Sequence, residues 1–236
     1  MMKPIRIFRH IDCEGPAYFQ TLLEQQQVPY ELVRIDAGEP VNSDLDTTSG
    51  LIFMGGDMSV NDPISWLDDE IALIKAAMAS DIPVMGICLG SQLMAKAMGS
   101  RVYPGPCMEL GWWPVNSLPT NKRDSGWTKT LPETLMAFHW HGETFDLPSG
   151  ASAIFGNDLY SNQGFVIGPH LALQFHLEME ADVIKEWLDR YPEDLAKRCD
   201  QTHDKDMILE MTTQYITQLQ GYAEHLLNHW LANIKK

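Results

Sequence analysis

The segment Pro83–Gly99, PVMGICLGSQLMAKAMG, restricts the possible folds more than any other part of the chain. Its first residues are apolar enough for a strand inside a sheet, and apolar residues then recur at helical spacing from Leu93 onward. Between them lies the pattern G-x-C-x-G, formed by Gly86, Cys88 and Gly90. It is typical of a nucleophile elbow, a turn so tight that neighbours without side chains are favoured. We therefore predict a strand, a sharp turn and a helix, with Cys88 at the corner.

A cysteine at such a corner is placed for nucleophilic chemistry. Cys88 would lie at the N-terminus of the following helix, where the positive end of the helix dipole favours the thiolate. The backbone N–H of Leu89 would then point at the group that Cys88 attacks. The alternative interpretation is a buried structural cysteine in an ordinary strand–helix turn.

A second candidate element is the segment LALQFHLEME, residues 171–180. Two sets of residues alternate there, as in a strand with two different faces, and His176 and Glu178 project to the same side. A histidine near a cysteine can take its proton, and a carboxylate beside that histidine fixes its tautomer. Taken alone, His176 could be a core histidine and Glu178 a solvated strand end.

Strand and helix patterns alternate through the first part of the chain. The predicted strands are residues 5–10, 31–35, 51–54 and 82–88, with helices at 17–27 and 64–79. This order predicts an α/β fold, with a mostly parallel central sheet flanked by helices on both sides. Sites in such sheets form beyond the carboxyl ends of the strands. Gly55, Gly56, Cys88 and the pair His176–Glu178 all fall there.

The pattern changes after residue 100. Short apolar segments separated by glycine and proline predict a small antiparallel sheet over residues 101–175. Apolar residues at 3–4 spacing from Ile208 to Trp230 then predict a helical stripe, which could break at Gly221. We predict a main domain over residues 1–190 and a C-terminal helical extension over 191–236 packed on it. A partner-binding helix is the alternative for the stripe.

Composition limits the partners. The chain has 236 residues with 44% hydrophobic side chains, enough for a sizeable core. Asp and Glu number 32 against 17 Lys and Arg, which gives a net charge of −15. Such a charge disfavours nucleic acid and anionic membranes as partners.

The cysteines and the apolar segments indicate the compartment. Cys13, Cys88, Cys107 and Cys199 are widely spaced, without a C-x-x-C pair or a zinc-type arrangement, so we expect free thiols. We see no apolar core of a signal peptide and no apolar run long enough to cross a bilayer. We therefore expect a cytoplasmic protein.

Several motifs occur in the order found in class I glutamine amidotransferases, and the chain resembles that family over most of its length. They are GGDMSVND, GICLGSQ, MELGWWPV, FHWHGETFDLP, SNQGF and QFHLE. The resemblance is to the branch related to the amidotransferase part of GMP synthetase and to γ-glutamyl peptidases. Three positions depart from the family pattern: Leu177 stands where proline is frequent, Asp57 replaces a frequent proline after the two glycines, and Gly164 stands where alanine is common.

The resemblance implies a flavodoxin-like fold and a Cys–His–Glu catalytic set formed by Cys88, His176 and Glu178. Glutamine or another γ-glutamyl small molecule is the implied substrate, and no cofactor or metal is implied. Gly56 and Leu89 would supply the oxyanion hole. The substrate-binding residues would be Gly55, Gln92, Asn162, Gln163 and Phe165.

Three functions remain open. The first is a glutamine amidotransferase or glutaminase that forms a γ-glutamyl thioester, with a separate synthase subunit as a possible ammonia acceptor. The second is a stand-alone γ-glutamyl peptidase or hydrolase. The third is a non-catalytic regulatory subunit that keeps the fold.

The motif FHWHGET places His139 and His141 on one face of a predicted strand. A pair of this kind could ligate a metal, but no third ligand is apparent from the sequence. We therefore prefer structural or pocket-edge roles for both histidines.

Overall fold

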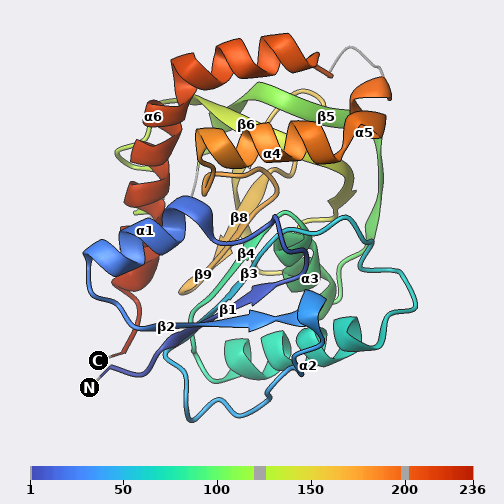
Figure 1. Ribbon diagram of the computed structural model, residues 1–236. Coiled ribbons are helices and arrows are strands. Elements are labelled where there is room, and N and C mark those ends of the chain that lie inside the picture. The colour runs from blue at the N-terminus through green and yellow to red at the C-terminus, as the bar shows by residue number, and fades with distance from the viewer. Residues whose placement is uncertain (1, 120–125, 198–201, 236) are drawn as a thin grey trace.

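In the part of the chain that the structure describes, a single sheet of nine strands organises the fold (Figure 1), in the order β2-β1-β3-β4-β9-β8-β7-β5-β6. The computed structural model describes residues 2–119, 126–197 and 202–235. Strands β1, β2, β3, β4 and β9 pair in parallel. Their bounds are Ile5–Arg9, Tyr30–Arg34, Gly50–Phe53, Val84–Ile87 and His170–Leu173.

The remaining strands are antiparallel and extend the same sheet, because β8 pairs with β9. Strands β5 and β6 form a long antiparallel pair, and β7 joins β5 to β8. Their bounds are β5 (Val102–Ser117), β6 (Thr134–Phe145), β7 (Ser152–Gly156) and β8 (Gly164–Ile167). The predicted α/β fold is confirmed, and the antiparallel strands continue the parallel sheet directly.

Helices cover both faces of the parallel strands, as Figure 1 shows. Alternate strand residues point to opposite faces. Ile52 therefore belongs to the hydrophobic cluster that contains side chains of α1, α4 and α6, whereas Phe53 belongs to the one that contains side chains of α2 and α3. The helices are α1 (Ala17–Gln25), α2 (Ser65–Ala79), α3 (Leu89–Ala97), α4 (Ala181–Arg190), α5 (Pro192–Ala196) and α6 (Lys205–Leu231), with a short 3₁₀ turn, η1 (Ile35–Ala37).

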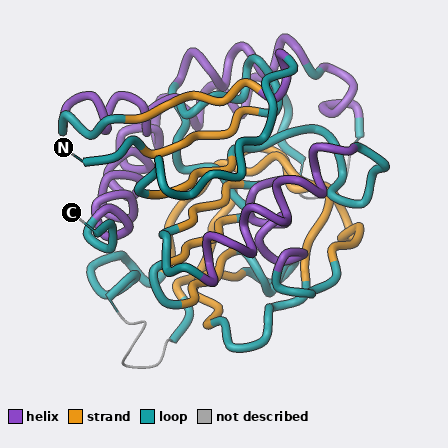
Figure 2. Tube along the Cα trace, turned by 90° about the horizontal axis from the view of Figure 1, so that it is seen from below, coloured by secondary structure: helices purple, strands orange, loops and turns teal. Residues whose placement is uncertain are grey.

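Helix α6 begins where the Asp204 carboxylate accepts the N–H of Met207 at 2.9 Å, a side-chain N-cap. It runs without interruption through Gly221, so the break considered there does not occur. The indole of Trp230 packs so closely on Gly50 that a Cβ at Gly50 would lie 2.8 Å from the ring. The end of α6 therefore covers the start of β3, and both chain ends lie on the same side of the molecule (Figure 1, Figure 2).

Within the described ranges, no helix combines the length and the apolar character needed to span a membrane.

Candidate active site

Cys88 occupies the turn between β4 and α3 in a strained backbone conformation. Its φ is +50° and its ψ is −107°, a combination that residues with side chains rarely adopt. A Cβ on Gly86 would lie 2.4 Å from the Gly90 carbonyl, and one on Gly90 would lie 2.1 Å from the carbonyl oxygen of Phe53. The N–H of Cys88 donates to the Leu173 carbonyl at 2.8 Å. Both glycines are thus required by close approach, and the thiol lines a cavity.

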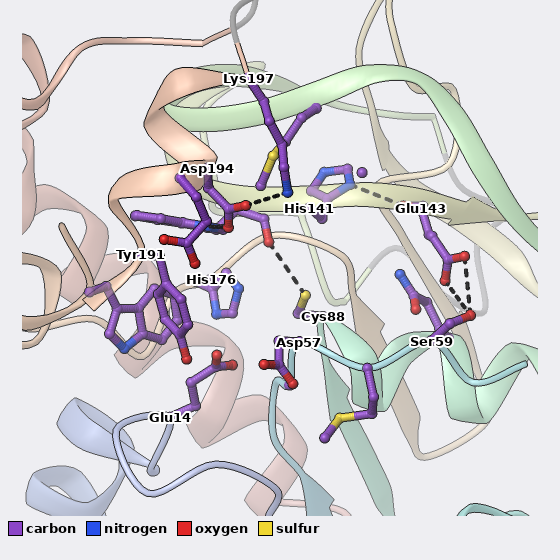
Figure 3. A pocket seen from close by; sticks show the side chains of 18 of the residues that line it. Glu14, Asp57, Ser59, Cys88, His141, Glu143, His176, Tyr191, Asp194 and Lys197 are labelled. Atoms are coloured by element: carbon purple, nitrogen blue, oxygen red, sulfur yellow. Dashed lines mark hydrogen bonds and ion pairs between the residues drawn. The ribbon is translucent and has the colours of Figure 1, made fainter. Parts of the chain in front are cut away.

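The segment after β9 brings His176 and Glu178 to Cys88. Residues 85–87 pair in parallel with residues 171–173, so β4 and β9 end at the same edge of the sheet. The Nδ1 atom of His176 lies 2.7 Å from Oε1 of Glu178. The Cys88 thiol lies 3.9 Å from the carbonyl oxygen of Trp140, and its interaction with the imidazole raises the pKa of His176. All three side chains are buried. Figure 3 shows the imidazole and the sulfur next to each other at the cavity.

The charge state of His176 follows from its neighbours. Burial by itself would lower the pKa of His176, because it disfavours the imidazolium. The negative charge of Glu178 outweighs this effect and Cys88 adds to it, so the pKa of His176 lies well above its ordinary value. The site therefore favours a protonated imidazole beside the sulfur, the pairing that stabilises a thiolate.

The glycine turn after β3 lies beside the sulfur. Gly56 lines the cavity, whereas the carbonyl of Gly55 lies 2.9 Å from Nδ1 of His10. Among the described residues, neither the N–H of Gly56 nor that of Leu89 donates a backbone hydrogen bond. Both donors are thus left for a ligand.

Gln174 belongs to the same surroundings and was missed by the sequence reasoning. Its Nε2 lies 3.7 Å from the Cys88 sulfur, and its Oε1 accepts from Nε2 of Gln92 at 3.2 Å. Gln92 lines the cavity, in keeping with its spacing of four from Cys88. The alternation of strand residues could have indicated Gln174, because it lies two residues before His176 and so points to the same face of the strand.

The segment SNQGF does not reach the cavity. Asn162 donates to the Phe145 carbonyl at 2.9 Å, and the Gln163 amide donates to Glu109. Phe165 packs edge-on against Phe145. None of these three predicted substrate contacts lines the cavity formed by the described residues. Their substrate contacts stay predictions and have no part in the function proposed below.

Glu109 on β5 lies next to His139 and His141 of the H-x-H motif. Ligand atoms of Glu109, His139 and His141 lie within 4.8 Å of one another, so the group is chemically able to hold a metal ion. The Nε2 atom of His141 lies 3.1 Å from the Glu109 carboxylate, which also accepts the side-chain amide of Asn157. Burial would raise the pKa of Glu109, but its bonds to the two histidines hold it far below the ordinary value. Glu109 could not be predicted from the sequence, because only the pairing register of β5 with β6 brings it opposite His141.

A cavity of about 580 Å³ opens above the sulfur. Glu14, from the loop between β1 and α1, lines it with only 8% of the residue exposed. Burial raises the pKa of Glu14 to about 7, with Asp57 and Glu178 adding to the effect and His176 opposing it. No sequence pattern had singled out Glu14.

The cysteines differ in state. Cys13 and Cys88 are free, but Cys107 is disulfide-bonded, so the expectation of a free thiol is wrong there. Spacing along the chain could not reveal this bond, because a disulfide depends on distance in space. Cys199 lies outside the described residues.

Comparison with known proteins places this geometry in context. A family model described as "Glutamine amidotransferase class-I" matches residues 12–188. A solved structure of a glutamine amidotransferase from Methylobacillus flagellatus is 33% identical with a TM-score of 0.95, and the match covers 100% of this chain and 97% of that one. A glutamine amidotransferase-like protein of Salmonella typhimurium is 27% identical over 69% of this chain and 70% of its own length. Gamma-glutamyl peptidase 4 of Arabidopsis thaliana is 26% identical over 73% of this chain and 70% of its own length.

Proposed function

Because the chain belongs to the class I glutamine amidotransferase family, we propose that it hydrolyses a γ-glutamyl amide through a thioester on Cys88. One observation carries the proposal: a cysteine on a strained turn lines the same cavity as His176, and the His176 imidazole lies 2.7 Å from the Glu178 carboxylate. Acyl transfer through a covalent intermediate requires a nucleophile, a base next to it and an acid that orients the base.

The chemistry proceeds in two steps. The Cys88 sulfur attacks the γ-carbonyl carbon, and His176 holds the thiol proton as imidazolium. The carbon–nitrogen bond then breaks, and His176 gives its proton to the departing amine. Water attacks the thioester with His176 as base, which releases glutamate and restores the thiol. Glu178 orients the imidazole and stabilises its charge throughout.

An oxyanion forms in both steps and needs donors. We assign the N–H groups of Leu89 and Gly56 to it, since neither donates a backbone hydrogen bond among the described residues. Loss of one such donor typically costs on the order of 100-fold or more in rate.

Two substrate classes fit this chemistry. Glutamine is the first, with a separate synthase subunit as acceptor of the ammonia. γ-Glutamyl peptides or conjugates are the second, favoured by the similarity to a γ-glutamyl peptidase and by a cavity of about 580 Å³, which has room for more than ammonia. In either case the cytoplasmic location and the division into residues 1–190 and 191–236 stay predictions.

One assay tests the proposal. The purified protein is given glutamine and a set of γ-glutamyl amides, and glutamate release is measured beside Cys88→Ala. Cys13→Ala is the matched control, since Cys13 is the other free cysteine of the described chain. Acid quenching and mass spectrometry would look for a γ-glutamyl adduct on residue 88.

We expect hydrolysis by the unmodified protein and by Cys13→Ala, and none by Cys88→Ala. Hydrolysis that persists in Cys88→Ala would remove the thioester from the mechanism. No hydrolysis of any compound, even after addition of proteins captured from the native cell, would favour the regulatory-subunit interpretation.

A further inference from the structure

More acidic than basic side chains line the cavity above Cys88. Several carboxylates face it, and Lys197 is its one lysine among the described residues. Lys197 is already used, because its Nζ lies 2.6 Å from Oδ1 of Asp194. Asp62 and Glu143 are engaged as well, since both accept hydrogen bonds from Ser59.

Glu14 and Asp57 line the same cavity and differ from Asp62, Glu143 and Asp194. Neither side chain takes part in a hydrogen bond or ion pair among the residues that the structure describes. Figure 3 shows both carboxylates directed into the same space below His176 and Cys88. Glu14 is only 8% exposed. Asp57 is exposed, whereas burial makes it costly to ionise Glu14. A ligand that brings a positive charge to Glu14 would reduce that cost.

Aromatic rings complete that part of the cavity. Trp140, Trp187 and Tyr191 line it, and Trp187 packs edge-on against the His176 ring at 5.0 Å between centroids. Trp140 meets Tyr191 edge-on at 6.0 Å. Aromatic faces together with carboxylates are the combination that binds organic ammonium groups.

The position of this group relative to the reaction fixes which part of a substrate it would meet. The departing amine receives its proton from His176 and so leaves on the side of that ring, where Glu14 and Trp187 lie. Gln92 lines the same cavity from α3, and we place the glutamyl end there. Because the pKa of Glu14 is raised to about 7, a bound cation would also favour its ionised form.

We propose that Glu14 and Asp57 bind a positive charge on the leaving amine, so that the preferred substrates are γ-glutamyl amides of diamines or similar cationic amines. This inference rests on the proposed hydrolysis and names its substrate class. It also predicts discrimination against anionic leaving groups, which the carboxylates would repel.

Three substrates with tails of similar length test the inference: γ-glutamyl-1,4-diaminobutane, γ-glutamyl-pentylamine and γ-glutamyl-4-aminobutyrate, which carry a cationic, neutral or anionic tail. We expect kcat/KM to be highest for the cation and lowest for the anion. A charge-assisted hydrogen bond suggests a difference of about 10–100-fold between cation and neutral tail. Glu14→Gln and Asp57→Asn should each reduce this ratio, and Glu210→Gln should not, since Glu210 is an exposed acid on α6.

The other results would contradict the inference. Equal kcat/KM for the three tails, or a preference for the anion, would overturn it while leaving the hydrolysis intact. An equal loss on all three substrates in Glu14→Gln would assign Glu14 to the glutamyl end and also overturn it. If no substrate is cleaved, the affinity of Cys88→Ala for each amide is measured by calorimetry. Tighter binding of the cationic amide would support the cation site and contradict the proposed hydrolysis. Equal binding of the three amides would contradict both proposals.

Discussion

The Nε2 atom of His10 lies 3.1 Å from Oε2 of Glu70, and both side chains are buried between the sheet and α2. The opposite ring nitrogen lies 2.9 Å from the carbonyl oxygen of Gly55, and Trp66 stacks on the ring. Burial would lower the pKa of His10, but Glu70 raises it above the ordinary value, so the imidazole is held as a donor on both sides. In a trans peptide the carbonyl and the following N–H point in opposite directions. Anchoring the Gly55 carbonyl therefore aims the Gly56 N–H away from His10.

We expect His10→Phe to lower kcat by on the order of 10–100-fold with little change in KM, because the Gly56 N–H, the proposed oxyanion donor, loses its anchor. The ring can still stack on Trp66, but Glu70 would keep an unpaired buried charge. The double variant His10→Phe/Glu70→Gln should recover stability and not rate. Steady-state kinetics and denaturant unfolding measure the two effects. An unchanged kcat in the double variant would show that the turn needs no anchor.

Glu178→Gln should keep the shape of the site and remove the charge that supports the imidazolium. We expect kcat to fall by about 100-fold to 10,000-fold, as for the acid of other nucleophilic triads. The same change should lower the pKa of His176, since Glu178 is the group that raises it most. Kinetics and a histidine titration by NMR check both expectations. A normal rate in a variant with a lowered His176 pKa would show that catalysis does not depend on the charge of His176.

Two glycine substitutions should change stability in opposite directions. Gly90→Ala would place a Cβ 2.1 Å from a backbone oxygen, so we expect a loss of about 3 kcal/mol or more in the free energy of unfolding. Gly221→Ala meets no atom within 4 Å and lies inside α6, so a gain of about 0.5–1 kcal/mol is expected. Urea unfolding with unchanged m-values measures both. A neutral Gly90→Ala would mean that the turn can open at little cost.

The free energy of unfolding should decrease as the pH rises, because of Glu14. Its pKa is about 7 in the folded protein against 4.5 as the reference value. Between these values the folded state binds the proton and the unfolded state does not, so raising the pH destabilises the fold. Relative to Glu14→Gln, the unmodified protein should lose up to about 3 kcal/mol between pH 4.5 and 7.5. The groups that face Glu14 are His176, Asp57, Glu178 and His10. Parallel pH dependences for the two proteins would contradict the raised pKa.

Much of the fold was predictable because the parallel strands carry strong local signals. The apolar residues of β3 and β4 are buried on both faces, and α2 begins within one residue of the predicted position. The long pairing of β5 with β6 was harder to predict, since its register depends on contacts between strands. The C-terminal stripe packs as the core interpretation predicts, with Ile208, Leu219 and Trp230 fully buried.

The candidate site was predictable where a residue belongs to a motif with a known spacing. Cys88, His176 and Glu178 come from two such motifs, and the structure brings their side chains together. Glu14 and Glu109 could not be found this way. Glu14 follows a strand in a loop without periodicity, and Glu109 depends on its partner strand.

The side-by-side pairing of β4 with β9 has a consequence for the order of events during synthesis. A ribosome makes Cys88 long before residue 176, and the two strands that align them can join only after both have emerged. Until β9 has paired with β4, the nascent polypeptide holds Cys88 without the imidazole that the proposed mechanism places beside it. An unfinished copy therefore lacks the base that the proposed hydrolysis requires.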